Sequence, residues 1–384
     1  MKALVLSPSE SSVSVRNIPK PSPGPREILI KIYDVALNHV DALYAKNPIA
    51  AQDDRVIGSD FSGEVVQLGE GLDVVDDARA KIGTRVAGFV QGACSVNLRP
   101  GAFAEYLAVE YDLTWHIPTT LSFESAATTS LCGLTAAQGV FARLQLPCPF
   151  FNTRGFSGLG LGDDSIVNVF IYGATSSLGL YAAQLVRASE KTSGRTMRLI
   201  GAASASKHAM LKQGPYAYDV LVDYCNVDWV EQVRRAARGG VQYAIDAISK
   251  SPSVEQVEQT LAEDGATLPA NPHARRFTAE FYNYMGSAAS SGVVKVQPNP
   301  VRLMPGGLER IALEGFALLT GAGGERPVSA EKIVMSVHHR TLGECTIDWT
   351  ETSQDHLRYK IIEMVCYLTP NATPTFSVDK CCFS

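Results

Sequence analysis

A short turn rich in small residues is the clearest candidate for chemistry in this chain. The sequence Ile171-Tyr172-Gly173-Ala174-Thr175-Ser176-Ser177-Leu178-Gly179 follows an apolar run and opens a helix-like run. Ala174, Ser176 and Gly179 stand where the dinucleotide-binding fingerprint has its three glycines. Small residues there let backbone N–H groups approach a pyrophosphate at a helix N-terminus. The segment predicts a nucleotide site, and the alternative is a structural tight turn.

A second polar group follows the next predicted strand. An NAD site usually carries an acidic residue there, which binds the ribose hydroxyls, and no acidic residue occurs from 196 to 211. The residues present instead are Ser204, Ala205, Ser206 and Lys207. Their hydroxyls and cation suit a 2′-phosphate, with Tyr224 after the third strand as a further candidate contact. This favours NADPH over NADH, unless Lys207 only caps a solvated helix start.

The elements that must position these residues differ between the two parts of the chain. Short apolar runs bounded by turn residues predict strands at 2–6, 12–15, 28–35, 63–68, 85–90 and 103–109. They indicate a small barrel-like β domain. Ser122, with Glu124 after it, predicts an N-cap for a helix that continues to Ala137 and leads into the second domain.

From Ile166 the pattern alternates between strand and helix. We expect strands at 166–172, 198–202, 220–223 and 242–248, and helices at 177–188, 207–213, 228–237 and 253–262. Such alternation requires crossover connections, and therefore a parallel sheet with helices on both faces. Further on, the sequence predicts a strand at 293–297, a helix at 307–319 and, at 332–337, a segment that returns to the first domain.

Composition limits the class of protein. The 384 residues suit two domains at roughly 100–200 residues each. With 46% apolar and 19% charged residues, the chain can form a sizeable core, and its net charge of −5 argues against a nucleic-acid or anionic-membrane surface. Because it lacks a secretory signal pattern and a membrane-length apolar run, we expect a cytoplasmic protein whose eight cysteines are reduced.

Several motifs occur in a consistent order along the chain. They are Ala36-Leu-Asn-His-Val-Asp41, Gly58-Ser-Asp-Phe-Ser-Gly63, Gly83-Thr-Arg-Val86, Gly101-Ala-Phe-Ala-Glu-Tyr106, the turn at Gly173 and Ser329-Ala-Glu-Lys332. Together they resemble the medium-chain dehydrogenase/reductase superfamily. More narrowly, they resemble its zinc-independent quinone-oxidoreductase branch, and within it the trans-acting enoyl reductases of the lovastatin type that serve fungal polyketide synthases.

The resemblance implies an α/β protein in which a GroES-like β-barrel catalytic domain is built from both ends of the chain. A Rossmann domain with a doubly wound parallel sheet lies between them, and the active site occupies the cleft. On this basis residues 1–125 begin the catalytic domain, 126–290 form the NADP-binding domain, 291–337 return to the catalytic domain, and 338–384 form an atypical tail.

The resemblance also implies site residues. Those expected around NADPH are Val40, Asp41, Ala42, Leu43, Gly173, Ala174, Thr175, Ser176, Ser177, Leu178, Gly179, Ser204, Ala205, Ser206, Lys207, Tyr224, Ala330 and Glu331. Those expected to line the substrate cleft are Thr129, Ser130, Leu131, Cys132, Gly133, Leu134, Thr135 and Ala136.

The chain departs from its relatives at informative positions. The zinc branch needs a Cys near 39 and a Gly-His-Glu run, but this chain has His39 and Gly58-Ser-Asp60, so we expect no metal and a packed or hydrogen-bonded His39. Relatives often carry a cleft lysine at position 43, which is Leu here, so the lysine is missing unless Lys46 replaces it. The polar segment after Gly265 is short where relatives place a strand and a substrate-side segment.

Reduction of an α,β-unsaturated thioester would need hydride at the β-carbon, stabilisation of the developing enolate and a proton for the α-carbon. Thr135, or backbone amides of 132–135, could stabilise the enolate oxygen. No catalytic residue is compelling. The weak candidates for the proton are Tyr44 and Lys46, with water as the alternative. Cys132 is expected to be a small packing residue.

The resemblance implies a trans-acting, NADPH-dependent enoyl reductase of secondary metabolism, a monomer or homodimer. Its substrate would ride on the carrier of a polyketide synthase or of a synthase-peptide synthetase hybrid. Arg234, Arg235 and Arg238, or Arg275 and Arg276, could receive that acidic carrier, unless they only form solvated surface. The alternatives are a free-standing quinone or enone reductase and a redox-inactive cyclase or scaffold.

Overall fold

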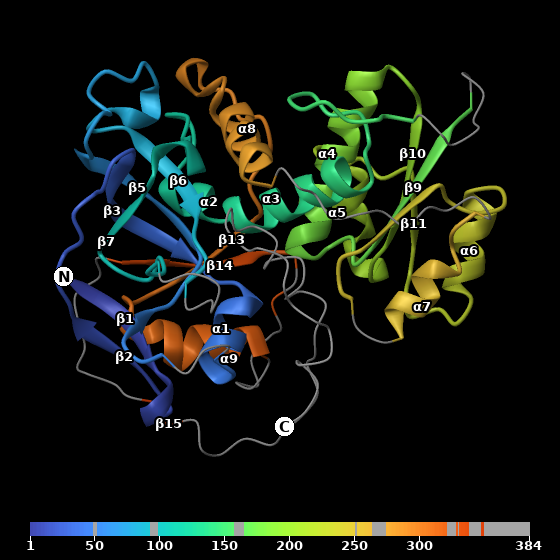
Figure 1. The fold of residues 1–384 in the computed structure, drawn as a ribbon. Coiled ribbons are helices and arrows are strands. Elements are labelled where there is room, and N and C mark those ends of the chain that lie inside the picture. Colours follow the sequence, from blue (N-terminus) through green and yellow to red (C-terminus); the bar gives the residue numbers. More distant parts are fainter. Residues whose placement is uncertain are drawn as a thin grey trace, which may run out of the picture.

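The structure is a computed structural model, and it describes residues 1–48, 52–92, 99–156, 165–249, 252–262, 274–320, 328, 330–337 and 347–348. Two lobes lie side by side, with the helix α3 (Ser130–Ala137) between them (Figure 1). The atypical tail, apart from a two-residue strand, and most of the shortened polar segment after Gly265 lie outside the described residues. None of the helices in the described ranges is long and apolar enough to cross a membrane.

The first lobe contains a sheet of seven strands. Six follow the order β13 (Val301–Met304), β14 (Lys332–Ser336), β3 (Glu27–Ala36), β5 (Asp60–Leu68), β6 (Arg85–Phe89) and β8 (Thr114–His116), and β7 (Tyr106–Glu110) pairs with β3. A smaller sheet has the order β15 (Ile347–Asp348), β2 (Ser12–Asn17), β1 (Lys2–Ser7) and β4 (Arg55–Val56). Inward-facing residues such as Ile30, Phe61 and Val86 form the buried core. The strands predicted in the first 110 residues are present, with shifted ends.

Residues near the far end of the chain complete this sheet. Strand β14 runs antiparallel to β3, with Val334 opposite Ala36, and parallel to β13 on its other side. The segment predicted to return at 332–337 therefore lies beside a strand that is about 300 residues earlier in the sequence. This pairing brings Lys332, at the start of β14, into the lobe that residues 1–110 form.

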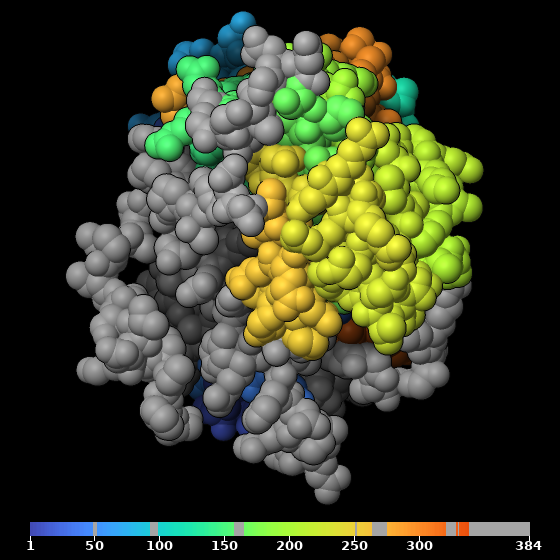
Figure 2. Space-filling model, turned by 90° about the vertical axis from the view of Figure 1, so that its right-hand side faces the viewer, coloured from blue at the N-terminus to red at the C-terminus, as the bar shows by residue number. Residues whose placement is uncertain are grey.

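The second lobe has a parallel sheet in the order β11 (Val220–Val222), β10 (Met197–Ala202), β9 (Val167–Tyr172) and β12 (Tyr243–Asp246). One face packs against α3, α4 (Ser177–Ser193) and α8 (Ala274–Gly286). The other face packs against α6 (Trp229–Ala236) and α7 (Ser253–Glu258), which Figure 2 shows in yellow. The α/β class with helices on both faces of a parallel sheet is confirmed.

The helix predicted from Ser122 to Ala137 is wrong in one respect. Ser122 caps it as expected, by accepting a hydrogen bond from Ser125 N at 3.2 Å, but the chain forms two helices, α2 (Phe123–Ala127) and α3. The break falls at Thr128, whose carbonyl accepts hydrogen bonds from Lys332 Nζ and Tyr181 Oη. Tertiary partners have replaced the intrahelical ones.

One predicted strand is absent. Residues 293–297 form no strand, because Val296 packs into the core of the second lobe and Gln297 N bonds Gln184 Oε1 on α4. The helix predicted at 307–319 is present, since the backbone is helical from 309 to 320, but its middle is a π-helical turn at Ile311–Gly315, which α9 (Phe316–Thr320) follows. Gly315 lies so close to Leu37 that a Cβ there would meet its side chain at 2.4 Å. Helix α8 was not predicted.

Candidate functional site

The turn between β9 and α4 has the geometry that a nucleotide fingerprint requires. Gly173 adopts φ +73°, and a Cβ on Gly179 would lie 2.4 Å from Gly173 O, so the strand and the helix approach too closely for any other residue at 179. Ser176 Oγ caps α4 by accepting a hydrogen bond from Gly179 N at 3.0 Å. Thr175, Ser177 and Leu178 keep partial solvent exposure, whereas Ala174 is buried.

The predicted 2′-phosphate residues lie at the carboxyl edge of the same sheet. Ser204 and Lys207 are partly exposed, Ala205 and Ser206 are exposed, and Tyr224 is 44% exposed after the neighbouring strand β11. An acid that the sequence analysis missed joins them. Asp223 accepts hydrogen bonds from Cys225 N at 2.9 Å and Ala205 N at 3.3 Å, and these backbone donors lower the pKa of its carboxyl. It was missed because it follows the third strand of the sheet, not the second.

Helix α1 (His39–Lys46) carries the predicted residues 40–43, and only part of it can face a ligand. Asp41 is 1% exposed; its carboxylate accepts hydrogen bonds from Ser59 Oγ at 2.5 Å and Asn38 N at 2.8 Å. Burial raises the pKa of Asp41 to about 7. The expectation that Asp41 borders a cofactor is therefore wrong for its side chain, because it serves as the helix's own cap. Val40 and Ala42 are buried as well, so Leu43 is the partly exposed member.

The two weak candidates for the proton donor, both on α1, lie in different environments. Tyr44 is 2% exposed and packs with Val40 and Leu131. Lys46 is exposed. His39 is exposed too, so of the two alternatives the packed histidine is wrong and the hydrogen-bonded histidine stays a prediction.

Most of the predicted substrate segment, residues 129–136, is buried. Six of its eight residues are buried, and Gly133 lies against Phe281 of α8. Cys132 and Thr135 alone in this segment keep partial exposure, and because they are three residues apart they share one face of α3. Burial raises the pKa of the Cys132 thiol, and the nearby Lys332 ammonium opposes that effect. The surface that α3 offers a substrate is therefore the face carrying Cys132 and Thr135.

A buried ion pair that the sequence analysis missed lies behind this face. Lys332 Nζ is 2.5 Å from Asp60 Oδ2, and the two side chains are 4% and 0% exposed. Burial disfavours the ammonium, but the Asp60 carboxylate outweighs this and raises the pKa of Lys332. Lys332 thus places a buried ammonium behind α3, whereas position 43 holds the partly exposed Leu43. The sequence signals for the ion pair were Lys332 at the head of an apolar strand and Asp60 within Gly58-Ser-Asp60.

Hydrogen bonds connect this pair to the nucleotide turn. Thr128 O accepts from Lys332 Nζ at 3.1 Å and from Tyr181 Oη at 3.2 Å. Asn299 N donates to Tyr181 Oη at 3.0 Å, and Asn299 Nδ2 donates to Ser177 Oγ at the first turn of α4. The predicted cofactor turn and substrate helix are therefore brought together.

The predicted contacts at 330 and 331 occupy the loop before β14. Ala330 is 8% exposed and adopts φ +59°. Glu331 is partly exposed, with its carboxylate 3.8 Å from the Arg302 guanidinium. Both follow Ser329, which lies outside the described residues.

Three of the five arginines considered for an acidic carrier have hydrogen-bond or ion-pair partners within the chain. Arg234 donates to the carbonyls of Gln259 and Leu261, and Arg235 pairs with Asp228. Arg275 pairs with Glu110 at 2.9 Å and Asp112 at 3.0 Å. Arg238 and Arg276 are exposed, as the alternative of a solvated surface expects, and at the other three arginines any carrier would compete with the partners named.

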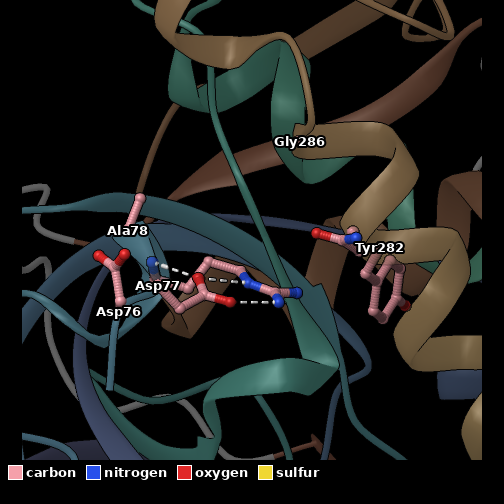
Figure 3. Close-up of a pocket in the computed structure, with 7 residues that line it drawn as sticks. Asp76, Asp77, Ala78, Tyr282 and Gly286 are labelled. Atoms are coloured by element: carbon pink, nitrogen blue, oxygen red, sulfur yellow. Dashed lines mark hydrogen bonds and ion pairs between the residues drawn. The ribbon is translucent and has the colours of Figure 1, made fainter. Parts of the chain in front are cut away.

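One pocket lies on the other side of α3, where its lining residue Tyr282 donates a hydrogen bond to Ser130 O at 3.5 Å. It is lined by Asp76, Asp77, Ala78, Arg79, Tyr282, Asn283 and Gly286 (Figure 3). Arg79 pairs with Asp77 at 2.6 Å and donates to Thr114 O at 2.9 Å, so the charges there already have partners. Within the described ranges, no group of three or more His, Cys, Asp or Glu side chains could hold a metal ion.

Comparison with known proteins agrees with this architecture. The family model described as "Alcohol dehydrogenase GroES-like domain" matches residues 24–119. "Enoyl reductase cheB" of Chaetomium globosum is 27% identical over 376 residues, covering 87% of this chain and 93% of that protein. "Trans-enoyl reductase traG" of Penicillium crustosum is 31% identical over 250 residues, covering 65% of this chain and 64% of that protein.

Solved structures show the same fold. An alcohol dehydrogenase superfamily protein from Novosphingobium aromaticivorans superimposes with a TM-score of 0.67 at 19% identity, covering 88% of this chain and all of that one. The GroES-like match, the relatives along most of the chain and this shared fold agree with one another. The chain has the fold of alcohol dehydrogenase superfamily proteins and is similar to fungal enoyl reductases and trans-enoyl reductases.

Proposed function

We propose that this protein is an NADPH-dependent enoyl reductase that reduces an α,β-unsaturated thioester carried by a polyketide synthase or a synthase-peptide synthetase hybrid. One observation carries the proposal. The nucleotide turn at Gly173 and the face of α3 with Cys132 and Thr135 adjoin, and hydrogen bonds through Tyr181 and Asn299 join the helices that bear them. Relatives named as enoyl reductases support the reaction type.

The residues present fit a nicotinamide dinucleotide. Gly173 and Gly179 leave the close backbone approach that a pyrophosphate needs, and the first turn of α4 supplies N–H groups. Ser204 and Lys207 are accessible at the adjoining strand end, and their hydroxyl and cation match a 2′-phosphate. When bound, the cofactor supplies hydride to the substrate's β-carbon.

The chain's own residues orient the substrate and stabilise charge. A thioester lying against α3 would meet the Thr135 hydroxyl, which can donate a hydrogen bond to the oxygen where negative charge develops. Because Tyr44 is buried among Val40 and Leu131, we assign the proton for the α-carbon to solvent and not to this phenol.

A substrate comparison tests the proposal. NADPH oxidation should be much faster with an α,β-unsaturated pantetheine thioester than with a small carrier-free enone of matched chain length. Oxidation with the free enone alone would identify a free-standing enone or quinone reductase. No NADPH binding in a titration would remove the redox assignment and favour a cyclase or scaffold on this fold.

A further inference from the structure

We propose that Lys332 is a positioning residue, which together with Asp60 sets the direction of α3 and so places the Cys132 and Thr135 face against the nucleotide turn. This inference rests on the proposed function for its kinetic consequence. Its structural part can be tested without any substrate.

The Asp60 carboxylate gathers donors from three separate elements. Oδ2 accepts from Lys332 Nζ on β14 and from Asn38 Nδ2, at the N-cap of α1, at 3.0 Å. Oδ1 accepts from Leu131 N, in the first turn of α3, at 2.7 Å. A fully buried carboxylate with three donors is fixed in position, because moving any of them leaves a buried charge unsatisfied.

The Lys332 ammonium and the Asp60 carboxylate form hydrogen bonds with the backbone on either side of the break between α2 and α3. Lys332 Nζ donates to Thr128 O, which is left without an intrahelical partner where α2 ends. Asp60 accepts from Leu131 N, which is one of the unsatisfied donors where α3 begins. The cation thus satisfies a carbonyl at the C-cap of α2, the anion satisfies an amide in the first turn of α3, and together they define the angle between the two helices.

The same ammonium lies close to the face that the substrate would meet. Lys332 Nζ is 4.0 Å from Cys132 Sγ, and Cys132 Sγ is 3.7 Å from Asn38 Oδ1. Tyr181 donates to the same Thr128 carbonyl, and Asn299 links Tyr181 to Ser177 in the first turn of α4. A shift at Thr128 therefore changes the position of the Cys132 and Thr135 face relative to the nucleotide turn. Ser204 and Lys207 lie at a different strand end, so affinity for the cofactor should change little.

A matched pair of variants separates positioning from stability. Lys332→Met removes the ammonium and keeps an unbranched apolar side chain that is one atom shorter. Arg79→Met is the control, because Arg79 is also a buried cation that binds one carboxylate and one backbone carbonyl, at the pocket in Figure 3. Asp60→Asn combined with Lys332→Met removes both charges and avoids an uncompensated buried carboxylate, so it carries the test if the single variant does not fold.

Hydrogen exchange measures the structural part on the full chain. The peptide covering 128–135 should exchange roughly tenfold faster in Lys332→Met and in the double variant, and at the parent rate in Arg79→Met. Unchanged exchange in both Lys332 variants would overturn the proposal. This result stands even if the parent shows no enoyl reduction, in which case only the proposed function fails.

Kinetics with NADPH and an unsaturated pantetheine thioester measure the functional part. We expect kcat to fall roughly tenfold or more in the double variant while the Kd for NADPH stays within about twofold. Lys332→Arg should recover part of this loss. If the double variant restores both the melting temperature and kcat, the pair only stabilises the fold and the proposal is wrong.

Discussion

Lys332 and Asp60 lie 272 residues apart in the sequence and form an ion pair in the interior, between the strand β14 and the strand β5. Through Thr128 O and Leu131 N they also determine where α2 ends and α3 begins. The position of the helix that we assign to the substrate thus depends on a contact between two segments that lie far apart in the sequence.

The first prediction concerns coenzyme choice. Lys207→Ala should raise the Kd for NADPH by roughly 10- to 150-fold, because one charge-assisted contact to the 2′-phosphate is worth about 1.5–3 kcal/mol. The Kd for NADH should change by less than about twofold. Fluorescence titration with both coenzymes measures this, and Lys212→Ala, at the end of α5 (His208–Lys212), is the control. An equal loss for both coenzymes would remove the 2′-phosphate assignment.

The second prediction concerns the turn itself. Gly179→Ala should weaken NADPH binding and lower the free energy of unfolding by about 1–3 kcal/mol, because the added Cβ would lie 2.4 Å from Gly173 O. Gly139→Ala is the matched control, since nothing lies within 4 Å of its added Cβ. Denaturant unfolding and NADPH titration of both variants provide the comparison. If Gly179→Ala behaves like the control, the close approach of β9 and α4 is not required.

The elements around this turn were predictable because their signals are local. Strand β9, the turn and α4 occur together in one stretch of apolar, small and helix-forming residues. Other features depend on contacts that no local pattern contains. Thr128 ends α2 because of Lys332 and Tyr181, and Asp223 reaches Ala205 only because β11 lies beside β10. The sequence placed Asp41 next to the cofactor, but in the structure its carboxylate is buried and caps α1.

The third prediction uses a buried carboxyl outside the site. Asp34 is 4% exposed, and burial, together with the nearby Glu124 charge, raises its pKa from 3.8 to about 7. The folded state therefore binds this proton more tightly than the unfolded chain does. The stability it contributes is complete below about pH 4 and is lost as the pH rises through about 7.

Asp34→Asn should remove this dependence. The melting temperature of the variant minus that of the parent should become more positive between about pH 5.5 and pH 8, as measured by calorimetry. Asp53→Asn is the control, because Asp53 is exposed and bonds from Ser9 lower its pKa, so it stays ionised throughout that range. A difference for Asp34→Asn that is flat with pH would show that this carboxyl is ionised in the folded protein.

The measurement that tests the central claim most directly is label transfer from the cofactor. The protein is incubated with an α,β-unsaturated pantetheine thioester and NADPH carrying deuterium at the transferred position of C4, and the product is analysed by mass spectrometry and NMR. We predict a saturated thioester with one deuterium at the β-carbon, formed in step with NADP⁺. Recovery of the unsaturated thioester with unconsumed NADPH, while binding of NADPH is demonstrated in the same sample, would contradict enoyl reduction by this protein.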